Sequence, residues 1–172
     1  DAPLLRSFIA NPNNIGCHTY GDSESAFKGA QDLEKEVIDV LAVDIFKAEP
    51  HTYDGYIATG GTEANIQALW IYRNLFMNEF GANLNEIVIL SSEDTHYSIP
   101  KGSNLLQIDN AKIPVDFDTR SIIETELDKI IIEFKETGKK YFIVVSNLAT
   151  TMFGSVDDPD VYAKYLTAHN CI

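Results

Sequence analysis

Apolar residues recur along this chain at two kinds of spacing, which predict helices and strands in alternation. Apolar positions three or four residues apart predict helices over about 24–46, 62–80, 101–106, 121–137 and 158–168. Short continuous apolar runs predict strands over 55–59, 86–91, 112–115 and 141–146, with another strand beginning at Cys171. Pro114 cannot donate to a ladder, so we expect the strand at 112–115 to lie at a sheet edge or to end at this proline.

Local residue chemistry marks several helix ends. Ser121 followed by Glu124 fits a capping box, and Asp158 before Pro159 fits an N-cap followed by a proline in the first turn. The spacing of Ala30, Leu33, Val37, Leu41 and Ile45 places one apolar stripe along the first helix.

Strands that alternate with helices predict an α/β layered fold with a mainly parallel sheet. Residues 1–23 are rich in Asn, Pro and Gly and are expected to form an arm, with 24–172 as the first part of one domain. Ligands bind outside the carboxyl ends of strands in such sheets. Polar runs beginning at Thr59, Ser92 and Asn147 each follow a predicted strand directly, so we expect them to converge on one crevice.

Charge narrows the choice of partners. The 172 residues carry 13 Lys and Arg against 26 Asp and Glu, a formal net charge of −13. A surface this acidic argues against nucleic acid and anionic membranes as partners. Cys17 and Cys171 have no partners at metal-ligand spacing, and no apolar run approaches the roughly 20 residues that span a bilayer. We therefore expect a cytoplasmic protein with reduced thiols.

The run from Thr59 to Asn65 is a candidate phosphate cradle. Gly60 and Gly61 let the backbone approach a ligand closely, and the helix that follows presents free N–H groups and its positive dipole end. Thr62 adds a hydroxyl. The run is neither a P-loop nor GxGxxG. A tight turn without any ligand explains the same residues equally well.

Two further runs have candidate chemistry. His96, beside an aromatic residue in a loop, can stack on a flat cofactor or transfer protons, although a loop histidine is more often a plain surface residue. Thr151 follows the strand at 141–146, where its hydroxyl can hold a carboxylate or phenolic oxygen, or simply end the strand. The acidic run 157–160 is better explained as helix capping than as a metal site.

Taken together, three segments resemble the group II pyridoxal-phosphate-dependent decarboxylases. GYIATGGTEANIQAL, from Gly55 to Leu69, resembles the family's phosphate-binding turn and helix. SSEDTHYSIPKGSNLL, from Ser91 to Leu106, resembles its histidine segment, and ATTMFGSVDD, from Ala149 to Asp158, resembles its G-T-T-x-x-G-x-x-D segment. Their order and separation also match, and the resemblance covers about residue 11 to the end. Ala149 departs from the pattern, because many relatives have glycine there.

The resemblance implies the fold, the cofactor and the roles of five residues. The fold would be the three-layer α/β/α large domain of fold-type-I pyridoxal-phosphate enzymes, with a mainly parallel sheet that is incomplete in this chain. Gly61 and Thr62 would contact the phosphate of pyridoxal 5'-phosphate, and Gly60 would shape the turn. His96 would stack on the pyridine ring and orient the substrate carboxylate. Thr151 would bond near the phenolic oxygen or the substrate.

The resemblance also implies what should follow Ile172. The family uses an aspartate on the pyridine nitrogen and a lysine bonded covalently to the cofactor, and we expect both beyond this residue. The 172 residues would then be a segment of a longer protein and inactive alone. The complete protein would be a homodimeric carboxy-lyase that converts an L-amino acid to an amine and carbon dioxide. An aminotransferase, a carbon–sulfur lyase or a non-catalytic phosphate-binding domain are the alternatives, and the substrate is not specified.

Overall fold

The computed structural model describes residues 28–172, which divide into a first unit ending at Ala58 and a second unit from Thr59 to Ile172. The predicted arm at 1–23 lies outside the described residues. The first unit contains helix α2 (Lys28–Asp39), which continues as a π-helix over Val40–Ile45. The helix predicted at 24–46 is therefore confirmed over the described part of its length.

The apolar stripe of this helix is largely exposed among the described residues. Leu33 is 61% exposed and Ile45 is 60% exposed, whereas the residues buried on α2 are Gln31 and Ile38. A π-helix has more residues per turn than an α-helix. Leu41 and Ile45 therefore leave the line that α-helical spacing predicts for them.

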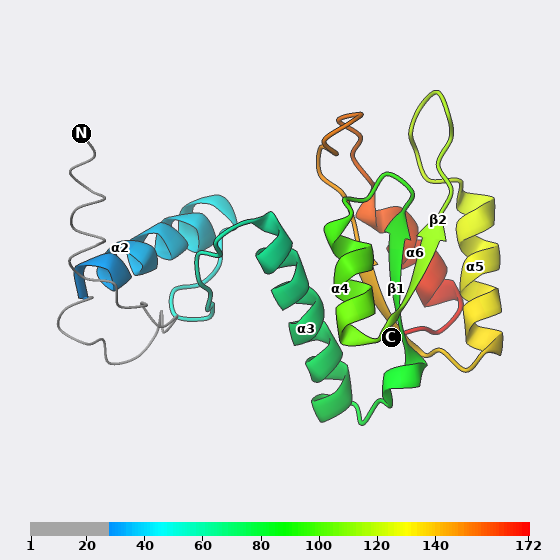
Figure 1. The fold of residues 1–172 in the computed structure, drawn as a ribbon, viewed down its shortest axis with the longest axis horizontal. Coiled ribbons are helices and arrows are strands. Elements are labelled where there is room, and N and C mark those ends of the chain that lie inside the picture. The colour runs from blue at the N-terminus through cyan, green and yellow to red at the C-terminus, as the bar shows by residue number, and fades with distance from the viewer. Residues whose placement is uncertain (1–27) are drawn as a thin grey trace. The chain divides into compact units, whose positions relative to one another are not determined.

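The second unit is built on a parallel three-stranded sheet in the order β2-β1-β3 (Figure 1). Its strands are β1 (Ile87–Ser92), β2 (Asp109–Ile113) and β3 (Tyr141–Val145). Val88 of β1 lies opposite Asp109 on one side and Phe142 on the other, so the central strand is paired along both edges. The mainly parallel sheet is confirmed, as is the edge position of the strand before Pro114.

The strand predicted at 55–59 does not form. Its residues have no regular structure, and the described chain contains strands only at β1, β2 and β3. A strand requires a hydrogen-bonding neighbour, and no segment within residues 28–172 pairs with this run. Local apolar composition cannot reveal whether such a neighbour is present.

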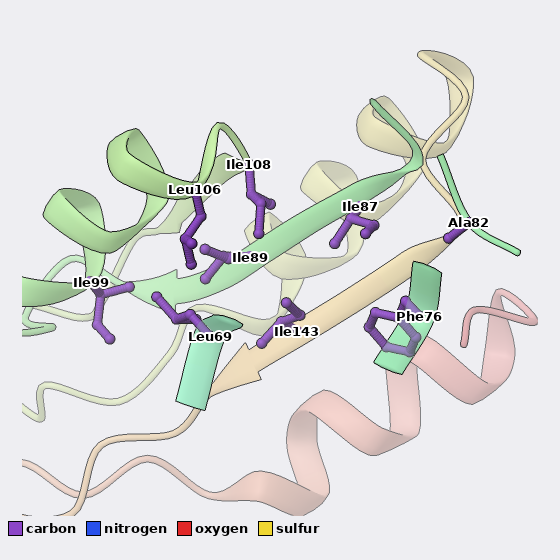
Figure 2. Packing of buried hydrophobic residues seen from close by; sticks show 9 residues of the cluster. All are labelled: Leu69, Phe76, Ala82, Ile87, Ile89, Ile99, Leu106, Ile108 and Ile143. Atoms are coloured by element: carbon purple, nitrogen blue, oxygen red, sulfur yellow. The ribbon is translucent and has the colours of Figure 1, made fainter. Parts of the chain in front are cut away.

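Helices cover both faces of the sheet, which gives the expected three layers. One face packs against α3 (Gly61–Glu79) and α4 (Ser98–Leu106), and the other against α5 (Glu124–Glu136) and α6 (Pro159–Ala168). In β1, Ile87 and Ile89 point into the α3–α4 layer (Figure 2). Val88 and Leu90 point into the α5–α6 layer. These four side chains are fully buried, each stabilising the fold by roughly 1.5–3 kcal/mol.

Helices α3 and α4 approach each other closely at Gly102. A Cβ at this position would lie 2.8 Å from Cδ1 of Leu69 and 3.4 Å from Cγ1 of Ile66. Glycine thus allows α4 to lie directly on the first turns of α3. This contact brings the residues at the start of α4 next to the helix that follows the glycine turn.

The helix boundaries test the two predicted caps. Asp158 caps α6 as expected, because its side chain accepts a hydrogen bond of 2.9 Å from the backbone N–H of Asp160. The capping box at Ser121 is wrong. Helix α5 begins at Glu124 after Ile123, without a side-chain cap. Ser121 belongs to the preceding turn, where its carbonyl accepts a hydrogen bond from the Asp116 N–H.

The last two residues run beside the outer edge of β3. The Ile172 N–H donates to the Lys140 carbonyl at 3.2 Å, and the Ile172 carbonyl accepts from the Phe142 N–H at 2.7 Å. These two bonds are the beginning of a strand ladder, in agreement with the strand expected from Cys171. Among residues 28–172, no helix is long and apolar enough to cross a membrane.

Candidate cofactor site

A pocket of about 630 Å³ opens at the carboxyl ends of β1 and β3. The loop after β1 contributes residues 94–97 and the loop after β3 contributes 146–152, and Asn65, Ile99 and Val145 also line the pocket. Figure 1 shows both loops at the same end of the sheet. His96 and Thr151 therefore line one pocket, which lies in the size range of small-molecule sites.

Asn147, which lines this pocket, connects the ends of β1 and β3. Its side-chain amide nitrogen lies 2.9 Å from Oγ of Ser92, the last residue of β1. The same nitrogen lies 2.8 Å from Oγ1 of Thr95, in the loop that follows β1. The same nitrogen donates to Asp157 Oδ2 at 2.7 Å, and the Asn147 backbone N–H donates to this oxygen at 2.9 Å. Asp157 is 4% exposed, so a buried polar network fixes where both loops begin.

This network is buried on the side that faces α6. Tyr162 is 1% exposed, and burial, with a smaller contribution from the Asp157 charge, raises the pKa of its phenol. Its hydroxyl and Asp157 Oδ1 have no hydrogen-bond partner among the described residues. The phenol therefore stays neutral and cannot accept a proton at ordinary pH.

A tight turn holds Thr151 at the rim of the pocket. The Thr150 N–H donates to the Ser155 carbonyl at 3.0 Å, and the two hydroxyls of these residues lie 2.7 Å apart. Ala149 adopts a φ of 60°, in the left-handed region that favours glycine. This backbone explains why glycine suits the position, and Thr151 is an exposed residue of the same turn.

Arg120 links this turn to the loop that carries His96. Its guanidinium makes a bidentate ion pair with Asp94, with Nε 2.9 Å from Oδ2 and a second contact from Nη2 to Oδ1. The guanidinium carbon also lies 4.2 Å from the centre of the Phe153 ring. The Asp94 carboxylate, whose side chain is 5% exposed, raises the pKa of Arg120, so this cation stays charged at every ordinary pH.

The His96 side chain is exposed, and Ser98 contacts its imidazole at Nδ1. Its Nδ1 lies 2.8 Å from Ser98 Oγ and 3.2 Å from the Ser98 backbone nitrogen. The imidazole centroid lies 4.2 Å from that of Tyr97, with the two planes tilted by 41°. Within residues 28–172 no protein group bonds to Nε2, so this atom is available to a ligand in the pocket.

The glycine turn lines a separate hollow of about 500 Å³. Gly60 has an extended backbone, and α3 begins at Gly61, so the first N–H groups of a 19-residue helix have no intrahelical acceptor. A Cβ at Gly60 or Gly61 would meet nothing within 4 Å, so this face of the turn is open. The Glu63 carboxylate lines the hollow and accepts hydrogen bonds from the Thr59 N–H, at 3.0 Å, and the Thr59 hydroxyl.

These two features fit the two ends of pyridoxal phosphate. Open backbone donors at a helix N-terminus suit a phosphate, and an exposed imidazole in a larger pocket suits a flat ring. The structure brings His96 and Thr151 together but places Gly60, Gly61 and Thr62 on their own hollow. The amide of Asn65, one turn into α3, donates to Ser98 Oγ at 2.8 Å and joins the two features.

Sequence reasoning missed the residues that connect these features. Asn65, Ser98 and Asn147 lie inside the three polar runs that follow predicted strands, so their sequence position is a usable signal. Arg120 stands in a loop that no motif covers, and its partner Asp94 is 26 residues away. Among residues 28–172, no group of three or more His, Cys, Asp or Glu side chains is arranged to hold a metal ion.

Known proteins place this site in a family. Residues 15–172 match the profile described as "Pyridoxal-dependent decarboxylase conserved domain". The chain is 56% identical to a tryptophan decarboxylase of Clostridium sporogenes over 169 residues, which cover 98% of this chain and 40% of that protein. It is 30% identical to a histidine decarboxylase of Klebsiella aerogenes over 168 residues, 98% of this chain and 41% of that protein.

A solved structure shows the same fold. The glutamate decarboxylase domain of diaminobutyrate-pyruvate transaminase and L-2,4-diaminobutyrate decarboxylase from Vibrio parahaemolyticus superposes with a TM-score of 0.74 at 20% identity. The match covers 99% of this chain and 38% of that one. The chain thus spans about 40% of the length of the curated relatives it matches. The expected large-domain fold and the expected cofactor class are confirmed, and the chain belongs to the pyridoxal-dependent decarboxylase family.

Proposed function

We propose that the complete protein containing this chain removes the α-carboxylate of an L-amino acid, with pyridoxal phosphate as cofactor, to give an amine and carbon dioxide. The observation that carries the proposal is the pocket that joins His96 and Thr151 beside the open N-terminus of α3. Family membership supports the same reaction. When bound, the cofactor acts as the electron sink for the carbon that loses the carboxylate.

Different residues of this chain would bind the phosphate, the ring and the substrate. The N–H groups at Gly61 and Thr62 would hold the phosphate, supported by the positive end of α3. His96 would lie against the ring and donate from Nε2 to the substrate carboxylate. Thr151, held by its turn, would donate its hydroxyl to the cofactor's phenolic oxygen or to the substrate. Gly61, His96 and Thr151 are exposed in the structure, and Thr62 is half-buried.

We propose an aromatic amino acid, with tryptophan first, as the substrate. Three apolar side chains line the pocket and are largely exposed: Tyr97 at 61%, Leu148 at 84% and Met152 at 82%. Such a wall favours a large apolar side chain over a charged one, because burying an unpaired charge against it is costly. The 56% identity to a tryptophan decarboxylase supports this choice.

The test uses the complete protein loaded with pyridoxal phosphate and a panel of tryptophan, tyrosine, histidine and glutamate. Chromatography with mass detection should find the amine and equimolar carbon dioxide, with the highest kcat/KM for tryptophan. A keto acid product would instead indicate an aminotransferase. Absence of cofactor absorbance after reconstitution would indicate a non-catalytic domain. A preference for histidine or glutamate would refute the aromatic substrate while leaving the reaction intact.

His96→Ala tests the orienting role within that reaction. Turnover should fall at least a hundredfold, while the Kd for pyridoxal phosphate should change by less than about tenfold, since general acid–base and orienting groups contribute about 10²–10⁴. His169→Ala is the matched control, because His169 pairs with Asp128 and does not line the pocket. Equal losses of turnover and cofactor affinity in His96→Ala would contradict the orienting role.

We further propose that the complete protein is a cytoplasmic homodimer. Helix α3 exposes Trp70 at 43%, Ile71 at 50% and Tyr72 at 51%, and apolar side chains of this size are typical of protein interfaces. The free thiol of Cys171 is typical of a reducing compartment. Sedimentation of the complete protein should give twice the subunit mass, and cell fractionation should find it with cytoplasmic enzymes. A monomer, or recovery from an oxidising compartment, would refute the respective statement.

A further inference from the structure

A chain of three polar side chains runs from α3 to His96. The Asn65 amide nitrogen donates to Ser98 Oγ at 2.8 Å, and Ser98 Oγ lies 2.8 Å from His96 Nδ1. Ser98 is fully buried, whereas His96 is exposed on the pocket. A buried hydroxyl needs hydrogen-bond partners, and these two neighbours are the ones it has among the described residues.

The direction of each bond in this chain can be deduced. The Ser98 backbone N–H also lies 3.2 Å from His96 Nδ1, and a backbone N–H can only donate. Nδ1 is therefore an acceptor and has no proton. Since Asn65 occupies a lone pair of Ser98 Oγ as a donor, the Ser98 hydroxyl is free to donate its own proton to Nδ1.

We propose that Asn65 and Ser98 are positioning residues that hold His96 as the Nε2–H tautomer. The ring nitrogen that faces away from Ser98 then presents a hydrogen-bond donor to the pocket. A donor there suits an anionic oxygen such as a carboxylate and disfavours a group that can only donate. The identity of this acceptor as the substrate carboxylate rests on the proposed function; the tautomer itself does not.

The arrangement also links the two ends of the cofactor site. Asn65 lies four residues after Gly61, on the helix whose first N–H groups face the phosphate hollow. Any rotation of the first turns of α3 would move the Asn65 amide away from Ser98. The phosphate hollow and the orientation of His96 are thus held in a fixed relation by one helical turn.

The test reads the tautomer directly in the complete apoprotein, so it does not require turnover. The protein is labelled with ¹⁵N-histidine, and one-bond N–H couplings are recorded at about pH 8.5, where histidine side chains are ordinarily neutral. The His96 signals are assigned by their loss in His96→Gln. A coupling on Nε2 and none on Nδ1 is the expected result. A proton on Nδ1 would overturn the proposal.

Asn65→Asp reverses one bond of the chain with almost no change of shape. A carboxylate only accepts, so the Ser98 hydroxyl must turn toward it and can no longer donate to His96. Among the described residues only the Ser98 backbone N–H then donates to Nδ1, so the preference for the Nε2–H tautomer should weaken and the Nδ1–H fraction should rise. We expect kcat to fall at least tenfold, with the KM for pyridoxal phosphate within about twofold. Asn65→Ala leaves the Ser98 hydroxyl free to donate, so the Nε2–H tautomer should survive.

Asn78→Asp is the matched control, because it makes the same change on the exposed side of the same helix. A purely structural tie between α3 and α4 predicts that Asn65→Asp and Asn65→Ala behave alike, and that result would overturn the positioning role. If no amino acid is decarboxylated by the wild type while the tautomer pattern is as expected, the proposed function fails and this inference stands.

Discussion

Replacing Ala149 with glycine should stabilise the protein, although glycine usually destabilises. Ala149 has a φ of 60°, in the turn that carries Thr151. The left-handed conformation costs an L-residue about 1–2 kcal/mol. Glycine avoids this cost but loses more backbone freedom on folding, which costs about 0.5–1 kcal/mol relative to alanine. The Ala149 side chain is exposed, so no packing is lost. The difference predicts a stabilisation of about 0.5–1 kcal/mol for Ala149→Gly.

The matched control is Ala163→Gly, at an exposed position in the middle of α6. Ala163 has helical backbone angles, and the same substitution there should cost about 1 kcal/mol. Urea unfolding of the complete apoprotein measures both variants against the wild type. The two midpoints should move in opposite directions with unchanged slopes. If Ala149→Gly lowers the midpoint as Ala163→Gly does, the turn is not held in the left-handed conformation and the reasoning is refuted.

Three further variants test the cap, the buried phenol and the loop link. Asp158→Ala removes the α6 cap and should lower the unfolding free energy by about 1 kcal/mol in urea titrations; no loss would show that the 2.9 Å bond to the Asp160 N–H does not contribute. Burial raises the folded-state pKa of Tyr162 above the ordinary value of 10.0, so the folded protein should lose stability as pH rises above about 10, where only the unfolded chain releases this proton. Tyr162→Phe should flatten that loss in unfolding midpoints taken between pH 8 and 11, and an unchanged slope would contradict it. Arg120→Lys keeps the charge but not the bidentate pair with Asp94, and kcat should fall by about ten- to a hundredfold as the His96 and Thr151 loops separate. Wild-type kcat in Arg120→Lys would mean that the pair does not position these loops.

The elements with strong local signals were predicted nearly to the residue. Helix α3 was expected at 62–80 and forms at Gly61–Glu79, and β1 was expected at 86–91 and forms at Ile87–Ser92. Both are held by burial of their apolar positions in the α3–α4 layer, so pattern and packing agree. The Asp158–Pro159 start of α6 was also correct, because a cap is a local interaction between neighbouring residues.

The errors arose where a local pattern depends on a distant partner. The apolar run at 55–59 has the composition of a strand but no neighbouring strand in residues 28–172. Ser121 fits a capping box in spacing, yet an antiparallel bridge between Val115 and Ile122 holds it in the preceding turn. The Asp94–Arg120 pair gave no sequence signal at all, since an ion pair across 26 residues has no spacing rule.

The geometry of the site explains why the polar runs beginning at Thr59, Ser92 and Asn147 indicate a cofactor site together, although none of them does so alone. A parallel sheet brings the loops after β1 and β3 to one end, where the bond from Asn147 to Thr95 joins them, so His96 and Thr151 line one pocket. The glycine turn is not part of that sheet and needs a different connection. Asn65 provides it, because the contact of α3 with α4 at Gly102 lets its amide reach Ser98. The packing of two helices, and not the sheet, therefore sets the distance between the phosphate hollow and the imidazole. A variant that pushes these helices apart, such as Gly102→Val, should disturb cofactor binding more than it disturbs either loop.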